Sequence, residues 1–427
     1  MRARLRPKTR QTFGALHSSR NYRLYMIGQS ISLTGTWMQT VAQAWLVLEL
    51  TGSGTSLGLV VALQFLPVLL LGPFGGLMAD RFPKRRVLLI TQVSFGLVAL
   101  TLGILTATDV VELWMVYLCA LAFGCITALD NPARQTFVME MVGREHLHNA
   151  VTLNTVNINM ARVIGPAVAG VIIGVIGIAP CFFLNAASYV AVIIALLMMN
   201  VALLQIAPAQ PRAKGQVREG FRYVWSDPRL RTPLVIMAVV GTLAYEFQVN
   251  LPLIASDTFN GDAATYGIMT GAMGVGAVIG GLFTASRSRT GDGPLIRSTL
   301  VFGAVIVAAA LMPTLPSMIA LLVVVGAGSV TFLTVANSTM QLRADEAFRG
   351  RVMALWAVAF LGTTPFGGPI IGWIGENVGP RWGMVVGGVA TVLAGLWGMW
   401  ALGTRADRES KRTALVAATQ AAELPAG

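Results

Sequence analysis

The stretch Gly76-Leu-Met-Ala-Asp80-Arg81-Phe-Pro83-Lys84-Arg85-Arg86 separates two long apolar runs of the chain. Its last six residues, 81–86, hold four cationic side chains. A stretch this short cannot leave a membrane and fold a domain of its own, and short loops rich in Lys and Arg are typical of the cytoplasmic side. We therefore expect a tight cytoplasmic hinge between two spanning helices.

The composition predicts an integral membrane protein. Of the 427 residues, 55% are hydrophobic and 12% are charged, and the mean hydropathy is +0.68. Soluble domains carry about 25% charged residues, so this chain has too little polar surface for a water-soluble body of its size. The net charge of +12 comes from short Lys and Arg clusters between apolar runs. Because that pattern sets orientation in a membrane rather than tracking phosphates, we predict no nucleic-acid partner.

Twelve apolar segments are long enough to cross a lipid bilayer, and they predict an all-α fold of twelve transmembrane helices. Lys and Arg gather on one side of these segments, whereas acidic residues such as Asp109, Asp262 and Glu376 lie on the other. Because the number of segments is even, both termini lie on the same side of the membrane. The side that is rich in Lys and Arg is the cytoplasmic one, so we expect both termini in the cytoplasm and the protein in the cell membrane. The predicted spans are 22–50, 56–79, 87–107, 112–136, 150–177, 180–203, 232–257, 265–285, 298–313, 316–340, 351–375 and 381–403.

An internal repeat of about 200 residues predicts two pseudo-symmetric six-helix halves. Three short motifs recur in the same order at a nearly constant offset, which composition alone does not explain. The paired motifs are Glu145–Val151 with Glu346–Val352, Gly165-Pro166…Gly170 with Gly368-Pro369…Gly372, and Gly75-Gly76-Leu77 with Gly280-Gly281-Leu282. The predicted divisions are a cytoplasmic arm 1–21, a half 22–203, a connector 204–231, a half 232–403 and a cytoplasmic tail 404–427.

The connector 204–231 contains a candidate amphipathic helix. Phe221, Val224 and Trp225 share one apolar helical face, and the cations Arg218, Arg222 and Arg229 lie nearby. This pattern predicts a helix in the membrane interface, with its rings at the level of the lipid headgroups. The alternative is a linker that covers the cytoplasmic side of the bundle.

The sequence predicts no enzyme. It holds no nucleophile–base–acid set, no phosphate-binding loop and no carboxylate pair with metal-binding spacing. Three cysteines and three histidines form no ligand pattern, so we expect no cofactor and no metal. The connector is too short for a nucleotide-binding domain, which an ATP-driven pump would need. If the protein moves a substrate across the membrane, the energy for that movement must come from an ion gradient or from the gradient of the substrate.

Polar residues within the spans are the candidate substrate and coupling residues, because charges are costly in hydrocarbon. Arg162 lies near mid-membrane, with Asn154 and Asn157 on its approach. Either these residues satisfy one another between helices, or they face an anionic or hydroxyl-rich substrate. In the first span, Gln39 and Gln43 are four residues apart and share a face, with Trp37 beside them.

Glu246 is the candidate proton-binding residue, since a carboxylate removed from water can take up and release a proton. Tyr245, Gln248 and Asn250 lie next to it in the sequence. The alternative is that Glu246 forms an ordinary ion pair, for which Arg162 is one candidate.

Two further groups of residues are predicted to take part in conformational change, one within the spans and one at the cytoplasmic side. Gly-Pro motifs predict bends and close packing in two spans, through Gly165, Pro166, Gly170, Pro365 and Pro369. At the cytoplasmic side, Asp130 and Arg134 are four residues apart and can pair, or Arg134 can reach Asp80 instead. We interpret Asp80, Arg81, Arg85, Asp130 and Arg134 as a cytoplasmic gate.

The hinge 76–86 resembles the Gly-x-Leu-Ala-Asp-Arg-x-Gly-Arg-Arg/Lys loop of the major facilitator superfamily. The runs Asp130-Asn-Pro-Ala-Arg134-Gln, Asn154 to Gly170 and Arg218-Glu-Gly-Phe-Arg-Tyr-Val-Trp225 resemble the branch that contains the enterobactin exporter and macrolide-efflux drug:proton antiporters. The resemblance implies two halves that rock about a central cavity in a prokaryotic inner membrane, and proton-coupled export of a small, often amphipathic molecule. A bundle with its cavity inside one chain does not need a partner subunit, so we expect a monomer. An importer or a lysolipid or nutrient facilitator of the same fold is the alternative.

Overall fold

The computed structural model describes residues 14–205, 216–287, 290–346 and 348–422, and within these ranges it is helical without β-strands. Within these ranges the side chains of 404–422 and of further positions, Asp80 among them, lie outside the described set. Much of the predicted arm 1–21, part of the connector 204–231 and the end of the tail 404–427 fall outside the described residues. The all-α expectation is confirmed.

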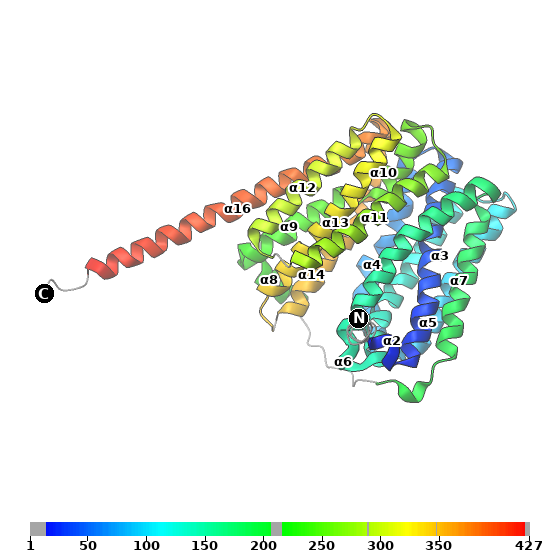
Figure 1. The fold of residues 1–427 in the computed structure, drawn as a ribbon, viewed down its shortest axis with the longest axis horizontal. Coiled ribbons are helices and arrows are strands. Elements are labelled where there is room, and N and C mark those ends of the chain that lie inside the picture. The colour runs from blue at the N-terminus through cyan, green and yellow to red at the C-terminus, as the bar shows by residue number, and fades with distance from the viewer. Residues whose placement is uncertain (1–13, 206–215, 288–289, 347, 423–427) are drawn as a thin grey trace, which may run out of the picture.

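The chain forms two groups of helices that stand side by side (Figure 1). The first group contains α2 Gly14–Ser18, α3 Arg20–Thr51, α4 Gly54–Arg81, α5 Lys84–Ala107, α6 Leu113–Ile176, α7 Ala179–Leu197 and η1 Val201–Leu203. The second contains α8 Gln216–Ser226, α9 Pro228–Leu243, α10 Phe247–Leu253, η2 Ile254–Thr258, α11 Ala263–Arg287, α12 Asp292–Ala310, α13 Leu315–Arg343, α14 Arg349–Leu361, α15 Thr364–Asn377 and α16 Pro380–Ala422.

Ten helical segments of the described chain are long and apolar enough to cross a membrane, against twelve expected. The difference has two sources. The long helix α6 covers two predicted spans, 112–136 and 150–177, and the backbone leaves helical geometry within it at Gly143, where φ is 71°. The first predicted span, 22–50, corresponds to α3, which is helical but is not among the ten because its many polar residues lower its hydropathy.

Two predicted spans are interrupted. The span 232–257 is divided into α9, α10 and η2, with a break at 244–246 that contains Glu246. The span 351–375 is divided into α14 and α15 by a break at 362–363, directly before Pro365. Non-helical backbone inside a membrane protein is tolerated where protein or a cavity surrounds it, and both breaks lie beside the central cavity described below.

The two groups repeat one packing contact. Gly75 of α4 lies against the carbonyl oxygen of Ala128 in α6, and Gly280 of α11 lies against that of Ala327 in α13. In each case an added Cβ would overlap backbone, so glycine is what lets the two helices approach closely. These glycines belong to one of the motif pairs that predicted the repeat.

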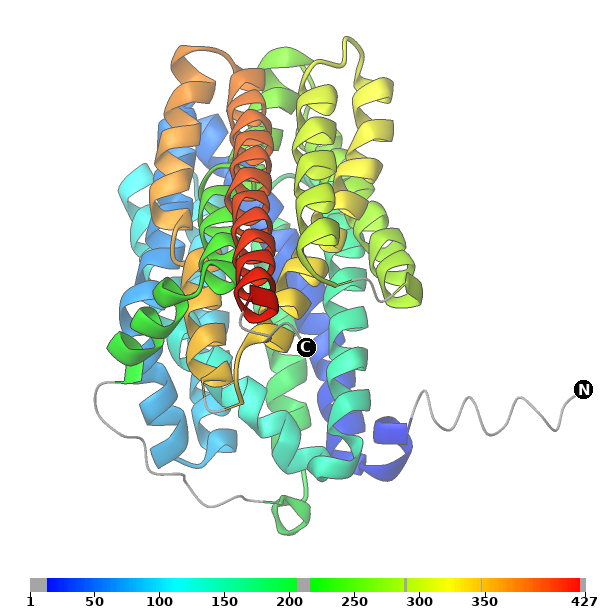
Figure 2. The ribbon, with the colours of Figure 1, turned by 90° about the vertical axis from the view of Figure 1, so that its left-hand side faces the viewer.

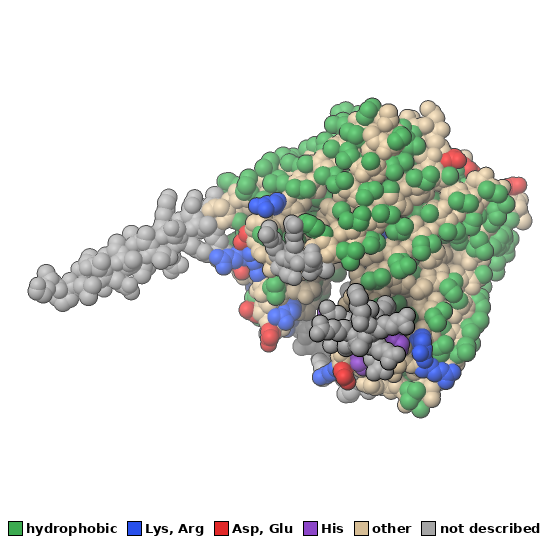
Figure 3. Space-filling model, in the orientation of Figure 1, with side chains coloured by type: hydrophobic (Ala, Val, Ile, Leu, Met, Phe, Trp, Pro, Cys, Tyr) green, Lys and Arg blue, Asp and Glu red, His purple; other side chains and the backbone are tan. Residues whose placement is uncertain are grey.

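Contacts between the halves run along two seams, α4 with α15 and α6 with α11. In the first seam, Gly54 packs on Gly372 and Gly58 packs on Gly368. In the second, a Cβ on Gly170 would stand 2.9 Å from Ala264 Cα. We call the end of the bundle that carries Ser53 and Glu376 the closed end, and the opposite end, which carries the hinge 81–86, the basic end. Figure 3 shows Lys and Arg side chains toward the lower, basic end of this face.

Helix α8 is attached to the basic end of the second half and lies at the edge of the bundle, at a slant to the long helices (Figure 2). Tyr223 stacks on Phe348 with 4.3 Å between ring centroids, and Arg351 pairs with Glu219 over 2.9 Å. The predicted apolar face is divided in the structure, because Val224 is buried whereas Phe221 and Trp225 are exposed and stack on each other. Contact of these rings with lipid stays a prediction.

Candidate substrate cavity

A cavity of about 470 Å³ lies between the two halves. Its wall from the first half is mostly polar, and it includes Asn154, Ile158 and Arg162, which are four residues apart and so share one face of α6. The remaining lining residues of this half are Leu33, Thr36, Trp37, Thr40, Val61, Gln64, Phe65, Asn131, Arg134 and Gln135. The second half contributes Tyr245, Glu246, Gln248, Phe360 and Thr364.

Arg162 is held against an aromatic ring rather than against an acid. Its guanidinium carbon lies 4.9 Å from the centroid of the Trp37 ring, and its Nε atom is buried without a hydrogen-bond partner. Gly165 brings the two helices together here, because a Cβ at that position would lie 2.6 Å from Trp37 Cβ. The guanidinium therefore presents hydrogen-bond donors and a positive charge to the cavity.

Glu246 faces the same cavity from the opposite half. It occupies the break between α9 and α10, its exposed fraction is 2%, and its Oε1 atom has no hydrogen-bond partner. Gly367 of α15 makes room for it, because a Cβ there would lie 2.8 Å from Oε1. Among the described residues no ion pair joins Glu246 to Arg162, so the two side chains remain on separate walls of the cavity.

The neighbours of Glu246 play different parts. Tyr245 lines the cavity with its ring edge-on to Phe360, and its hydroxyl donates to the Ser329 carbonyl oxygen over 2.9 Å. Gln248 lines both this cavity and a smaller one beside it. Asn250 lies outside the cavity lining, buried beside Gly383 of α16.

The predicted glutamines of the first span line the smaller cavity, whose volume is about 20 Å³. Gln39 is held in place because Asn185 Nδ2 donates to its Oε1 over 2.6 Å. Gln43 is buried in the same lining. Asn157 is also buried, with its Nδ2 unpartnered, and does not line the large cavity. Six of the ten predicted cavity residues thus line the large cavity: Trp37, Asn154, Arg162, Tyr245, Glu246 and Gln248.

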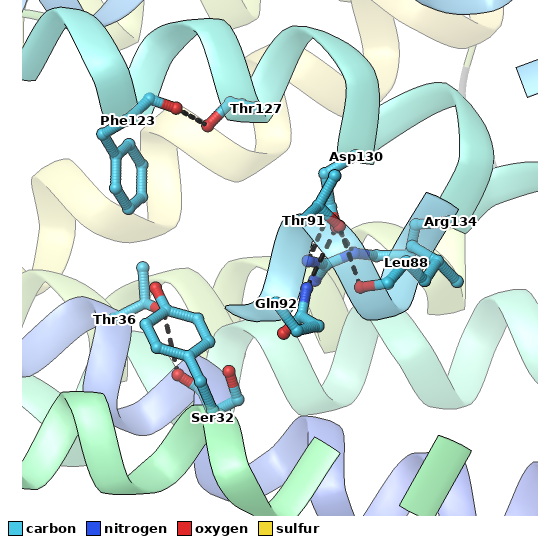
Figure 4. Close-up of polar contacts among 10 residues, drawn as sticks. Ser32, Thr36, Leu88, Thr91, Gln92, Phe123, Thr127, Asp130 and Arg134 are labelled. Atoms are coloured by element: carbon cyan, nitrogen blue, oxygen red, sulfur yellow. Dashed lines mark hydrogen bonds and ion pairs between the residues drawn. The ribbon is translucent and has the colours of Figure 1, made fainter. Parts of the chain in front are cut away.

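Asp130 is the centre of a buried polar cluster in the first half (Figure 4). Its carboxylate accepts hydrogen bonds from Thr91 Oγ1 over 2.6 Å, from Gln92 Nε2 over 3.0 Å and from Arg134 Nε over 2.8 Å. Asp130 is 1% exposed, whereas Arg134 lines the cavity. The cluster therefore fixes the Arg134 guanidinium at the cavity wall. Of the two partners considered for Arg134, the structure shows Asp130, while the Asp80 side chain lies outside the described set. Thr91 and Gln92 were not predicted as members of the cluster.

The remaining gate candidates lie at the basic end. Arg81 is exposed, and the Asp80 side chain lies outside the described residues. Arg85 donates to the carbonyl oxygens of Leu196, over 2.7 Å, and Leu197, over 3.3 Å, at the C-terminus of α7. A cation is favoured there by the helix dipole. Arg85 thus binds within its own half.

Glu140, which was not predicted as a site residue, forms an ion pair with Lys84 next to the hinge. Glu140 of α6 is 5% exposed and pairs with Lys84 over 2.8 Å. Nothing in its spacing marks it, because the helix that carries it is brought to the hinge only by the fold.

The Gly-Pro motifs differ in their effect. Helix α6 continues through Pro166. Gly170 allows close contact with α11, as described above. Pro365 lies in the first turn of α15, where the missing N–H of proline costs no helical hydrogen bond. Pro369 lies inside α15, at the point where Gly58 of α4 packs.

Comparison with known proteins gives relatives among transporters. The chain is 26% identical over 359 residues to the multidrug efflux pump Tap of Mycolicibacterium fortuitum, covering 81% of this chain and 87% of that one. It is 25% identical over 365 residues to the enterobactin exporter EntS of Citrobacter koseri, covering 84% and 83%. The match to the MFS-type transporter YfiS of Bacillus subtilis is 28% identical but spans 50% of this chain and about half, 52%, of that one.

The same fold occurs in solved structures. A bacterial homologue of the human lysosomal transporter Spinster, in an inward-facing and unoccupied conformation, superposes with a TM-score of 0.72 at 13% identity, covering 90% of this chain and 97% of that one. At that identity the likeness concerns the fold alone.

The family assignment rests on most of the chain. Residues 12–419 match the model of the family described as transmembrane secretion effector. This match covers both halves and the cavity between them, and the relatives named above are transporters of the major facilitator superfamily rather than enzymes. The chain belongs to the transmembrane secretion effector family of major facilitator superfamily transporters.

Proposed function

We propose that this protein exports a small amphipathic molecule from the cytoplasm by alternating access, in exchange for protons. The observation that carries the proposal is a pair of ionisable side chains, Arg162 on one half and Glu246 on the other, that line one cavity between the halves and form no ion pair within the part of the chain that the structure describes. An ionisable side chain within a membrane costs free energy of desolvation, and such residues usually mark a substrate or ion pathway. We therefore assign these two residues a role in substrate binding or proton coupling. The names of the relatives Tap and EntS support export.

The cavity walls suit a substrate with two kinds of surface. The first half offers Arg162 and the amides of Asn131, Gln135 and Asn154 to an anionic or hydroxyl-bearing group. Tyr245, Phe360 and Trp37 offer aromatic faces to an apolar part. Such a division favours an amphipathic small molecule.

Coupling follows from the position of Glu246. A proton on its carboxyl removes the negative charge from the cavity wall and so changes the energy of closing the two halves around that wall. Protons are exchanged for substrate when the proton-loaded form and the substrate-loaded form cross between the two conformations in opposite directions. We propose that both termini and the basic end face the cytoplasm, and that the protein works as a monomer because the cavity is formed within one chain.

The test is transport by inside-out membrane vesicles with an imposed pH gradient. A deletion strain is first profiled for drug susceptibility and metabolite accumulation, which supplies a substrate. We expect the vesicles to accumulate this substrate when their interior is acidic and to release protons in step. Accumulation in vesicles of the opposite orientation would favour an importer, and accumulation that ignores the pH gradient would favour a facilitator.

A further inference from the structure

Glu376 links the two halves at the closed end. It lies in the last turn of α15, in the second half. Its Oε2 atom accepts two hydrogen bonds from the first half, one from Ser53 Oγ over 2.7 Å and one from the backbone N–H of Thr55 over 2.9 Å. The carboxylate thus stands at the N-terminus of α4, where backbone N–H groups lack helical partners and a negative charge is favoured.

The first turn of α4 is therefore capped from two sources. Ser53 is its own N-cap and accepts a hydrogen bond from the Ser56 backbone N–H over 3.1 Å, while its hydroxyl donates to Glu376. The Thr55 N–H is satisfied by the other half of the protein. A cap supplied across the interface exists only while the halves touch at this end.

The interface next to this cap is tightly filled. Gly54 and Gly372 bring α4 and α15 into backbone contact. Leu253 of α10 fills the space beside them, because a Cβ on Gly54 would lie 2.7 Å from its Cδ1 atom and a Cβ on Gly375 would lie 2.8 Å from it. Leu253 itself is 0% exposed. The α4–α15 seam is therefore closely packed beside Glu376.

From this geometry we infer that Ser53, Thr55 and Glu376 form a latch that holds the closed end shut and must release whenever the cavity opens there. The latch rests on the alternating access of the proposed function, but not on the direction of transport or on protons. Its strength depends on the charge of Glu376, because hydrogen bonds to an ionised acceptor are stronger than those to a neutral one.

The test measures how often the closed end opens. A Leu253→Cys reporter is placed in a chain whose Cys119, Cys125 and Cys181 are replaced by Ser, and the full chain in lipid nanodiscs is treated with a maleimide. We expect Glu376→Ala to raise the labelling rate about fivefold, within the range of about twofold to thirtyfold that the loss of a helix cap corresponds to. Glu376→Gln should raise it less, because an amide oxygen still accepts a hydrogen bond.

Two variants control the assay. Glu49→Ala removes an exposed acid that accepts a hydrogen bond from Trp45 Nε1 over 2.8 Å within α3, and it should leave the rate unchanged. Gly58→Ala forces the seam itself apart and should raise the rate.

An unchanged rate in Glu376→Ala, with Gly58→Ala still raising it, would overturn the latch. A lower melting temperature with an unchanged labelling rate would likewise assign Glu376 a merely structural role. The assay uses neither substrate nor a pH gradient, so a negative result would not contradict the export proposal. In the same way, a failure to observe proton-coupled export would not change the interpretation of the labelling rates.

Discussion

Gly58 of α4 and Gly368 of α15 bring the two halves into direct backbone contact: a Cβ on Gly368 would stand 2.8 Å from the carbonyl oxygen of Gly58. Closed and open forms of a transporter differ in such seams, because packed interfaces move between discrete arrangements rather than deform continuously. The contact therefore predicts where substitution alters conformation.

Gly58→Ala should weaken the closed end, because its new methyl group would overlap the backbone of Gly368. Overpacking of this kind costs about 1–3 kcal/mol. The melting temperature in detergent should fall, and labelling at the closed end should rise. Gly72→Ala is the matched control, because Gly72 is in the same helix and has no atom within 4 Å of an added Cβ. Equal effects of the two substitutions would contradict the seam.

Glu246→Gln should abolish transport driven by a pH gradient, since an amide cannot carry the proton. Exchange of labelled for unlabelled substrate needs no net proton movement and should persist. Both rates are measured in the same vesicles. Glu49→Gln serves as the control acid, and a Glu246→Gln protein that still concentrates substrate would rule out Glu246 as the coupling group.

Arg162→Lys should weaken substrate binding although it keeps the charge. The planar guanidinium over Trp37 is lost, and a compact ammonium does not replace its fixed set of donors. A cation–π contact contributes about 1 kcal/mol, so we expect KM to rise by roughly fivefold while the maximal rate changes less. A KM identical to that of the unsubstituted protein would show that Arg162 only fills a gap between helices.

Asp130→Ala should destabilise the first half, because it leaves the Arg134 guanidinium without its acid. Removing one partner of a buried pair costs about 3–5 kcal/mol. The double variant Asp130→Ala with Arg134→Met removes both charges and should recover part of the loss in melting temperature. If the double variant is as unstable as the sum of the two single ones, the pair does not act as a unit.

Much of the fold follows from hydropathy. Long apolar runs predict helices, and the predicted hinge 76–86 contains the junction between two of them. Helix α4 continues to Arg81 and α5 begins at Lys84, so the turn itself is shorter than the predicted hinge. The break at 244–246 could not be predicted, because Ala244, Tyr245 and Glu246 carry no helix-breaking signal. The break at 362–363 differs, because it lies directly before Pro365, in a span whose Gly-Pro motif predicted a bend. Non-helical backbone is tolerated at both breaks because they lie beside the cavity, and the cavity forms only when segments far apart in the chain pack together.

The cavity residues that could be predicted from the sequence are the charged ones that lie deep within a predicted span. Arg162 and Glu246 stand out because each is a charge within a span, and both line the cavity. Asn250 is also polar and within a span, but it lies in α10, which begins only after the break at Glu246, and it is buried against Gly383 of α16. Glu140 and Glu376 were missed as partners, since Lys84 and Ser53 meet them only after the helices have packed.

The most direct test of alternating access is a pair of distances measured by double electron–electron resonance in lipid nanodiscs. One spin-label pair, at Leu50 and Val378, spans the closed end, and the other, at Phe82 and Leu342, spans the basic end; all four side chains are exposed. With Glu246→Gln as the stand-in for the protonated protein, we predict that the first distance lengthens while the second shortens. Two distances that move in the same direction, or that stay fixed with and without substrate, would contradict rocking of the two halves about this cavity.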